Sequence, residues 1–468
     1  MNTSRTNSTG QITTIKSSPE RQPLSFDDLH AQTPAQKRAL SYANTLYFLF
    51  HQVMDTKLPA DRVVGEYFRV NKKHGSKDRR VIRESLFALF RWWGWLRKFN
   101  IHLKQEQNSQ IWLLVLATNA RLESHNWSDL ISAWCIFCHI DTLELETVPM
   151  LSSVAEKCAW INSQFTTLTF TTDELVPAWF WEICPSHNTE QGLCLIESLS
   201  SRPPIWGRVQ NINVKSAIQK LLTLDISATG SEFFSDSINL GHKNINLNGL
   251  TLYKEGELEI QDLGSQVVGQ ICDPQANDKW WDACSGAGGK SLQLTSLMLQ
   301  KNKQAKGNII ASDIRKKPLK ELTKRAERAG FKQIAISPWA SDELPVPYAH
   351  FDGVLVDVPC SCTGTWRRNP DMRWTDTINS VLDKSALQLD ILQRASLGVK
   401  EHGTLVYATC SLSPLENEAV VNAFLAQHDE FSLEVTTHPF TNMQATMHTI
   451  QPYQADTDGM FVARMVKR

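Results

Sequence analysis

Two segments of the sequence place a thiol directly after an apolar run that predicts a buried strand. In the first, Val354-Leu355-Val356 is followed by Asp357 and then by Pro359-Cys360. In the second, a strand predicted at 404–408 leads into Thr409-Cys410-Ser411. The carboxyl ends of strands form the edge at which an open α/β sheet binds ligands. Two thiols on neighbouring strand ends therefore predict a reaction site rather than core packing.

A third thiol and an arginine pair follow the first of these strands. Cys362 comes two residues after Cys360, and Arg367-Arg368 come shortly afterwards. Residues 351–374 thus combine an acid, thiols and two guanidinium groups. We interpret this stretch as the centre of the reaction site.

A glycine-rich turn follows another predicted strand and indicates a bound cofactor. In residues 282–291, DACSGAGGKS, glycines let the backbone approach a ligand, and the next helix offers free N–H groups to an anion. A P-loop needs glycine where Cys284 stands, and a dinucleotide fingerprint needs glycine where Ser291 stands. Of the three ligands that could use such a turn, S-adenosylmethionine remains, because its carboxylate can lie against the turn. The candidate cofactor residues are Cys284, Ser285, Gly286, Ala287, Gly288, Gly289 and Lys290.

The next predicted strand ends on Asp313, some twenty residues past the glycine turn. An acid at this edge suits the two ribose hydroxyls of a nucleoside, and it also suits the N-cap of a helix. Its position alone does not favour the ribose contact over the N-cap role. The glycine turn favours the ribose.

The carboxyl-terminal half alternates between strand and helix patterns, which predicts a parallel sheet with helices on both faces, a Rossmann-like α/β fold. A helix start with a capping box is predicted at Ser413-Pro414-Leu415-Glu416. Strands are predicted at 279–283, 308–312, 333–337, 352–357 and 404–408, and helices at 289–300, 318–330 and 378–402.

The amino-terminal half lacks the alternating strand and helix pattern of the carboxyl-terminal half. Residues 1–36 are polar, which predicts a disordered tail. We predict a helical domain at 37–165, a small linking subdomain at 166–249, and the domain that binds S-adenosylmethionine at 250–468. Asp61 to Lys98 holds eleven Lys or Arg against four acids, in a chain whose net charge is -1. A solvated helix face would explain some of this surplus, and a phosphate-facing patch that includes Arg79 and Arg80 explains it better.

Composition narrows the class of protein further. The ten cysteines show no framework spacing, so they predict reduced thiols. The sequence has no apolar run of about 18 residues and no secretory h-region, from which we expect a cytoplasmic protein with no membrane partner. We also expect a monomer without a metal ion.

Several of these motifs together resemble one family. Residues 257–266, 282–291, 357–371, 407–418 and 458–461 resemble the RsmB/Sun (Fmu) family of RNA 5-methylcytosine methyltransferases. The basic segment, with Ala60-Asp61-Arg62 and Lys77-Asp78-Arg79-Arg80, is similar to the NusB-like helical domain of the bacterial 16S ribosomal RNA enzyme.

The resemblance implies a role for each candidate residue. Cys410 would add to C6 of cytosine, and Cys360 would assist release of the product. Asp357 would hold the base and lie close to the cofactor, while Lys290 would contact the base or the cofactor. Arg367 and Arg368 would grip phosphate or a stacked base, and the target base would have to be unstacked.

The sequence departs from the family pattern at three places. Ser285-Gly286-Ala287 stands where the family usually has Ala-Ala-Pro, and Cys362 replaces a usual glycine. The strand at 333–337 is followed by Pro338-Trp339 instead of an acid that contacts adenine. Either Trp339 stacks on the adenine or Asp342 approaches it.

Three functions fit these observations to different degrees. The first is an S-adenosylmethionine-dependent RNA cytosine-C5 methyltransferase with ribosomal RNA as its substrate. The second is a non-catalytic RNA-binding ribosome-assembly factor that retains the fold, which the presence of both thiols disfavours. The third is a DNA cytosine methyltransferase, whose nucleophile is the Pro-Cys thiol, and the additional Thr-Cys-Ser thiol argues against it.

Overall fold

The protein is described by a computed structural model, which defines Leu24, Phe26 and residues 29–101, 109–138, 150–184, 186–187 and 189–468. Most of the predicted tail at 1–36 lies outside these residues. The chain divides into two compact units, one of residues 1–89 and 96–150 and the other of 90–95 and 151–468. Among the described residues, no helix has both the length and the apolar character needed to cross a bilayer.

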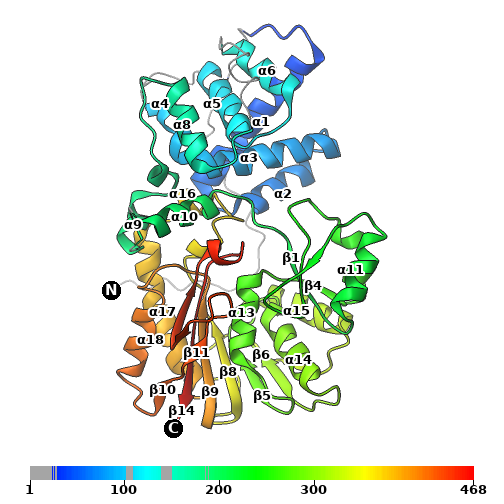
Figure 1. The fold of residues 1–468 in the computed structure, drawn as a ribbon, viewed down its shortest axis with the longest axis vertical. Coiled ribbons are helices and arrows are strands. Elements are labelled where there is room, and N and C mark those ends of the chain that lie inside the picture. Colours follow the sequence, from blue (N-terminus) through cyan, green and yellow to red (C-terminus); the bar gives the residue numbers. More distant parts are fainter. Residues whose placement is uncertain are drawn as a thin grey trace, which may run out of the picture. The chain divides into compact units, whose positions relative to one another are not determined.

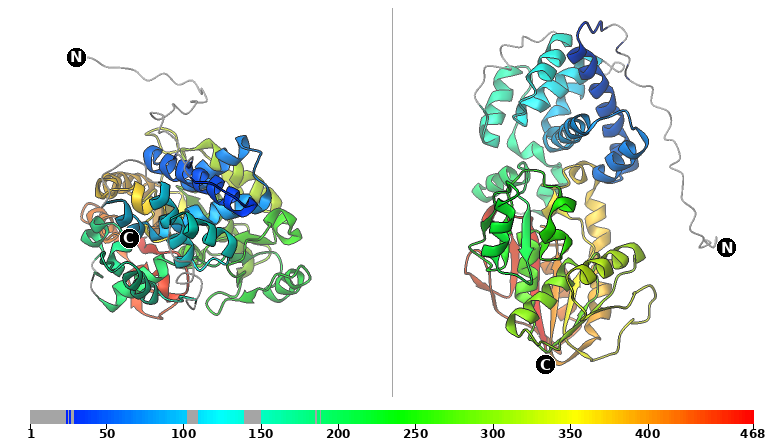
Figure 2. Two further views of the ribbon diagram at one scale, coloured as in Figure 1. Left: turned by 90° about the horizontal axis from the view of Figure 1, so that it is seen from above. Right: turned by 90° about the vertical axis from the view of Figure 1, so that its right-hand side faces the viewer.

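The first unit is built from helices, drawn in blue to cyan in both views of Figure 2. Its first helix starts at a capping box in which Thr33 and Gln36 satisfy each other's backbone N–H groups, and it buries a stripe that includes Leu46, Leu49 and Val53. The helices are α1 (Pro34–Thr56), α2 (Ala60–Val70), α3 (Ser76–Leu96), α4 (Lys98–Ile101), α5 (Ser109–Leu122) and α6 (Ser128–Phe137), and the last turns of α3 count with the second unit.

The second unit begins with short helices and a small antiparallel sheet. The sheet order is β2-β3-β1-β4, and β4 pairs with β1 across the boundary predicted at residue 249. The helices are α8 (Val154–Gln164), η1 (Thr172–Leu175), α9 (Ala178–Ile183), α10 (Glu190–Leu199), α11 (Val214–Leu222), η2 (Leu247–Gly249) and α12 (Thr251–Lys254). The strands are β1 (Trp206–Val209), β2 (Thr229–Gly230), β3 (Ser237–Asn239) and β4 (Leu258–Ile260).

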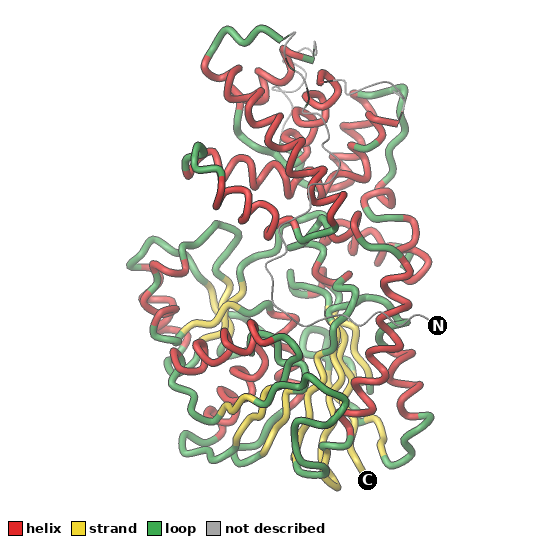
Figure 3. The backbone as a smooth tube through the Cα atoms, turned by 180° about the vertical axis from the view of Figure 1, so that it is seen from behind, coloured by secondary structure: helices red, strands yellow, loops and turns green. Residues whose placement is uncertain are grey.

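The main sheet has eight strands in the order β10-β14-β9-β8-β5-β6-β7, with β13 paired to β14. The strands β7, β6, β5, β8 and β9 run parallel, and β14 runs antiparallel to β9. All strands of the structure, yellow in Figure 3, belong to the second unit as far as residues are described. The strands are β5 (Lys279–Asp282), β6 (Asn308–Ala311), β7 (Ile334–Ile336), β8 (Phe351–Asp357), β9 (Val399–Thr409), β10 (Phe431–Leu433), β13 (Met447–Ile450) and β14 (Met460–Lys467), and β11 (Thr436–Thr437) and β12 (Gln444–Ala445) form a separate pair.

Helices cover both faces of this sheet, as predicted (Figure 1). One core packs α17 and α18 against the sheet through Leu392, Val421 and Phe424, and the other packs α13 and α14 through Val267 and Leu294. The helices are α13 (Leu263–Cys272), α14 (Gly289–Lys301), α15 (Lys316–Arg328), α16 (Met372–Thr375), α17 (Ile378–Ser396) and α18 (Glu418–Leu425), with the short helices η3 (Thr363–Thr365) and η4 (Pro452–Gln454).

Two sequence-based boundaries differ from the structure. The helix predicted at 378–402 ends at Ser396, because residues 399–403 already belong to β9. The helix predicted to begin with a capping box at Ser413 and Glu416 begins instead at Glu418, with Asn417 as its N-cap. The Glu416 side chain is thereby released for another role.

Candidate active site

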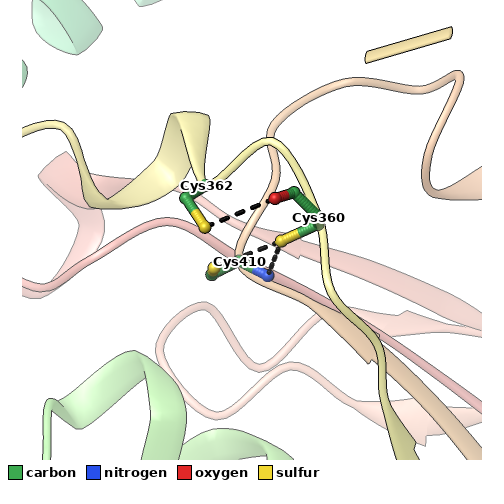
Figure 4. A group of neighbouring side chains, drawn as sticks. All are labelled: Cys360, Cys362 and Cys410. Carbon is green, nitrogen blue, oxygen red and sulfur yellow. Dashed lines mark hydrogen bonds between the residues drawn. The ribbon is translucent and has the colours of Figure 1, made fainter. Parts of the chain in front are cut away.

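The two thiols on the strand ends are in direct contact. β8 and β9 pair in parallel with Asp357 opposite Ala408, so the chain segments that follow them leave the sheet side by side. The Cys360 and Cys410 sulfurs lie 3.2 Å apart, and the backbone N–H of Cys410 donates to the Cys360 sulfur at 3.3 Å (Figure 4). The predicted neighbourhood of the two thiols is therefore present.

A buried carboxylate that sequence reasoning did not assign to the site joins the two thiol loops. Glu416 is fully buried and accepts from the Ser361 N–H at 2.8 Å, the Ser411 hydroxyl at 2.5 Å, the Gln388 amide at 2.9 Å and the Ser361 hydroxyl. Ser361 directly follows Cys360, and Ser411 directly follows Cys410. Glu416 thus fixes the distance between the loops. In the sequence, the serine that directly follows each cysteine was the feature that could have indicated a shared buried acceptor.

Cys362 adds a third sulfur to this pair. Its backbone is left-handed, with φ 57° and ψ 24°, a conformation that costs a residue with a side chain about 1 kcal/mol. Its thiol contacts the carbonyl oxygen of Cys360 at 3.4 Å. S–H donation from Cys360 and Cys410 lowers the pKa of Cys362, whereas hydrogen bonding to the neighbouring thiols, together with burial, raises the pKa values of Cys360 and Cys410.

Lys290 and Asp357 form an ion pair beside the thiols. The Lys290 ammonium lies 2.7 Å from an Asp357 oxygen and 3.0 Å from the Ser265 hydroxyl, and only 11% of its side chain is exposed. Burial disfavours its charge, but the Asp357 carboxylate outweighs this and raises the Lys290 pKa. Lys290 therefore stays cationic, and it interacts electrostatically with Cys410.

The glycine turn has the shape and the open polar groups of a ligand cradle. Gly288 has φ +83°, and a Cβ there would lie 2.3 Å from Leu322. No side chain caps α14, so its first N–H groups can face a carboxylate. Ser285 Oγ and Asp282 Oδ1 are buried without a hydrogen-bond partner among the described residues. A buried polar atom without a hydrogen bond lowers the stability of the fold unless a ligand bonds to it. The cradle therefore fits the polar end of S-adenosylmethionine.

Asp313 lies beside this turn, as its predicted role requires. It is 5% exposed, and its carboxylate accepts from the Gly286 N–H at 3.0 Å and from the backbone and side chain of Arg315. These hydrogen bonds outweigh burial and lower its pKa. The helix that follows is capped by Arg315 without a side-chain bond, so Asp313 is not its N-cap. Arg315 is 67% exposed and can leave the carboxylate to a ribose.

The two candidates for the adenine contact have different surroundings. Trp339 is 8% exposed in the core, with its ring 5.2 Å from that of Trp281 and the Arg394 guanidinium 5.1 Å from its centre. Its Nε1 is buried without a partner among the described residues. Asp342 is fully exposed and pairs with Arg394 at 3.5 Å. Of the two, only Trp339 offers an unpaired polar atom, and its adenine contact stays a prediction.

Both arginines of the predicted RNA-binding pair form contacts within the chain. Arg367 is 2% exposed and donates to the Thr457 carbonyl at 2.9 Å, to the Ser201 hydroxyl at 2.8 Å and to Asp456. Its guanidinium therefore bonds within the protein, and the contact with phosphate stays a prediction.

Arg368 is also bound to its own chain. It lies 2.5 Å from Asp262 and 2.6 Å from Asp458, and these two carboxylates outweigh burial and raise its pKa. Two acids against one guanidinium leave no net positive charge for RNA. The pair joins the segment after β8 to the segment that precedes β14, and the RNA contact of Arg368 stays a prediction.

Most cations of the basic segment are exposed, although Arg91 is buried. Arg80 is 65% exposed and 3.5 Å from Glu84. Arg79 is half-buried, donates to the His74 carbonyl at 2.9 Å and covers the Phe68 ring at 5.5 Å. A nearby hollow of about 220 Å³ is lined by Arg38, Lys77, Trp127 and Asn126 among others. Exposed cations beside an aromatic ring suit a nucleic acid.

Parallel strand order, glycine cradle, ribose-side acid and strand-end thiols define a Rossmann-like S-adenosylmethionine-dependent methyltransferase domain. Residues 269–466 match the family model of the 16S rRNA methyltransferases RsmB/F. This match over residues 269–466 confirms the resemblance and the expected cofactor.

Known proteins agree with this assignment. The chain is 34% identical over 258 residues to a probable ribosomal RNA small subunit methyltransferase B of Synechocystis, covering 53% of this chain and 56% of that protein. It is 28% identical over 303 residues to the ribosomal RNA small subunit methyltransferase B of Yersinia pseudotuberculosis, covering 63% and 67%. The solved structure of PH0851 has the same fold, with a TM-score of 0.68 at 23% identity, over 94% of this chain and 100% of that one. The match thus spans little more than half of the Synechocystis relative.

Proposed function

We propose that this protein is an S-adenosylmethionine-dependent methyltransferase that acts on C5 of a cytosine in 16S ribosomal RNA. The observation that carries the proposal is the contact between the Cys360 and Cys410 sulfurs, 3.2 Å apart at the ends of adjacent parallel strands. The names of the two curated relatives support a small-subunit ribosomal RNA substrate. The resemblance to the RsmB/Sun family supports cytosine as the base.

Two thiols suit this reaction because it needs a covalent bond that is made and later broken. Cytosine C5 is a weak nucleophile until a thiolate adds to C6, which makes C5 enamine-like. Cys410 forms the S–C6 bond. S-adenosylmethionine, when bound, supplies the electrophilic methyl group. Loss of the C5 proton and breaking of the S–C6 bond then restore the C5–C6 double bond and free Cys410, with Cys360 assisting this release.

The charges next to the thiols support the same assignment. Asp357 is positioned by Lys290 at 2.7 Å and has 28% of its side chain exposed, so it can hold the edge of an unstacked base. The Lys290 ammonium attracts negative charge on Cys410 and so opposes the hydrogen bonds and the burial that raise the Cys410 pKa. Lys290 therefore positions Asp357 and stabilises negative charge on the nucleophile.

Binding of the RNA itself is assigned to the first unit. Arg367 and Arg368 are engaged by acids of the second unit, whereas Arg80 is exposed in the basic segment. Neutralising backbone phosphates requires such exposed cations and gives binding that weakens with salt. We infer that α2 and α3 provide this contact.

The test is transfer of a labelled methyl group from S-adenosylmethionine to 16S ribosomal RNA. Cys410→Ala is expected to abolish transfer, and Cys360→Ala to accumulate a denaturation-resistant protein–RNA adduct. Cys194→Ala, which removes an exposed thiol, is the matched control and should behave as the unaltered protein. Undiminished transfer by Cys410→Ala would remove the nucleophile assignment, and no adduct with Cys360→Ala would contradict the division of labour.

Bisulfite sequencing of RNA from cells with and without the gene identifies the modified nucleotide. Preferential methylation of DNA in a competition with RNA would overturn the substrate. Binding of S-adenosylmethionine without turnover on any RNA would instead indicate an assembly factor.

A further inference from the structure

The thiol cluster contains one sulfur more than the proposed reaction uses. The sulfurs of Cys360, Cys362 and Cys410 all lie within 4.8 Å of one another. Figure 4 shows the Cys362 thiol pointing toward the other two from the opposite side of the loop. Methyl transfer assigns a task to Cys360 and Cys410 and none to Cys362.

The backbone at Cys362 makes this third thiol costly to keep. Its φ of 57° lies in the left-handed region, where glycine is favoured. The resembled family usually has glycine at this position. A side chain held in such a conformation at a reaction site indicates that the side chain has a use there.

We propose that Cys360, Cys362 and Cys410 form a Zn²⁺-binding site with three thiolate ligands and one open coordination position. Zinc binds thiolates at about 2.3 Å, which places tetrahedral sulfurs about 3.8 Å apart. The sulfurs here are 3.2 Å apart for Cys360 and Cys410 and at most 4.8 Å for the other pairs, so this separation falls inside the observed range.

The surrounding charges suit a thiolate–zinc complex. Three thiols that bind Zn²⁺ release three protons and form a complex of net charge about -1, with no change of oxidation state. The ammonium of Lys290 interacts with Cys410, and that of Lys384 interacts with Cys362. Both cations stabilise a complex with negative charge.

The fourth position stays open to solvent water. Glu416 joins the two loops, but both of its oxygens are occupied by Ser361, Ser411 and Gln388. Asp357 is held by Lys290. Zinc sites with three protein ligands keep a fourth position for water or another ligand, whereas structural sites are closed by four protein ligands. We therefore infer a reversible site.

Zinc at this position would occupy both thiols that the reaction needs. The ion would then inhibit methyl transfer, and a chelator would restore it. This inhibition rests on the proposed function, whereas zinc binding itself does not. Cys362 would be the residue that makes the active site sensitive to zinc.

The experiment is a Zn²⁺ titration of the reduced full-length protein against a chromophoric chelator. One ion per chain is expected, bound roughly 100-fold more weakly by Cys362→Gly, which loses one thiolate and leaves the proposed catalytic thiols in place. Cys362→Ser, which keeps the side-chain size, should weaken binding similarly. Cys194→Ala again serves as the control. Equal affinity in the unaltered protein and both Cys362 variants would overturn the proposal.

A second readout identifies the ligands directly. Cd²⁺ in place of Zn²⁺ should give an ultraviolet thiolate-to-metal band with the intensity of three sulfurs, falling by about one third in Cys362→Gly. A band unchanged by Cys362→Gly would show that other cysteines bind the ion. If methyl transfer is absent in all proteins, the proposed function fails while the titration still decides the zinc site.

Discussion

Asp282 is expected to make the folded second unit less stable as the pH rises. Its side chain is fully buried at the end of β5, Oδ2 accepts from Ser291 at 2.5 Å, and Oδ1 has no partner among the described residues. Burial opposes the charged form and raises the pKa of Asp282 from 3.8 to about 7. The protonated form is thus favoured in the folded protein, and the stability it confers is complete below pH 3.8 and lost as the pH rises through about 7.

The size of this effect follows from the two pKa values. A gap of about 3 pH units, at about 1.4 kcal/mol per unit, amounts to about 4 kcal/mol in the free energy of unfolding. Asp282→Asn cannot ionise and should not lose it. At pH 5 Asp282→Asn should already be the more stable by about 1.7 kcal/mol, since about 1.2 of the about 3 pH units have been crossed, and at pH 8.5 it should be the more stable by about 4 kcal/mol.

Urea unfolding at the two pH values measures this difference, followed by circular dichroism and by tryptophan fluorescence, since Trp280 and Trp281 are buried next to Asp282. Glu255→Gln, at an exposed site, is the matched control and should show no such trend. A stability difference between Asp282→Asn and the unaltered protein that is the same at pH 5 and pH 8.5 would refute the reasoning. The same variant should bind S-adenosylmethionine more weakly in calorimetry, because Oδ1 is lost from the cradle.

Three further outcomes are expected. Glu416→Ala should lower the free energy of unfolding by about 3 kcal/mol in urea and abolish methyl transfer, because the Ser361 N–H and its neighbours lose their acceptor; near-normal activity would contradict its role in holding the loops. Asp313→Asn should weaken S-adenosylmethionine binding about tenfold in calorimetry, since a charge-assisted bond to ribose is worth about 1.5 kcal/mol, and unchanged affinity would remove the ribose assignment. Arg80→Gln should lower by about one the slope of the logarithm of the RNA-binding constant against the logarithm of salt concentration. Arg367→Leu should leave this slope unchanged and should lower the free energy of unfolding by about 3 kcal/mol. If filter binding shows the reverse pattern, Arg367 contacts RNA.

The strand and helix pattern was predictable wherever local sequence decides the structure. The turn from β5 into α14 was placed correctly, because apolar strand, glycines and helix start are all local signals. The end of α17 was not, since β9 begins at Val399 and is irregular before Thr404, with His402 at φ 60° and a register shift against β8. The apolar residues after Ser396 continue the helical pattern in sequence, so only pairing with β8 shows that they are strand.

In the site, too, the roles that depend on neighbouring residues in the sequence were predictable, and those that depend on residues far along the chain were not. The thiols and Asp313 were found because each follows a strand, and strand ends meet at one edge. Glu416 was given a local capping role because its partners Ser361 and Gln388 lie 55 and 28 residues away. The partners of Arg367 and Arg368 likewise lie about ninety or more residues away, at Asp456, Asp458 and Asp262. Charge type alone does not show which acid is nearby.

The pairing of these charges indicates where the attraction for RNA resides. At the carboxyl edge of the sheet, Lys290 is paired with Asp357, Arg315 with Asp313, and Arg367 and Arg368 with three acids. Paired charges produce little field at a distance of more than about 10 Å in physiological salt. Residues 61–98, by contrast, hold eleven Lys or Arg against four acids, and Arg62, Lys72 and Lys73 among them are exposed. This distribution supports the proposal that the first unit provides the attraction for RNA, while the paired charges leave the edge that bears the thiols nearly neutral. Near neutrality there favours a neutral base over phosphate beside Cys410, as methylation of a base requires.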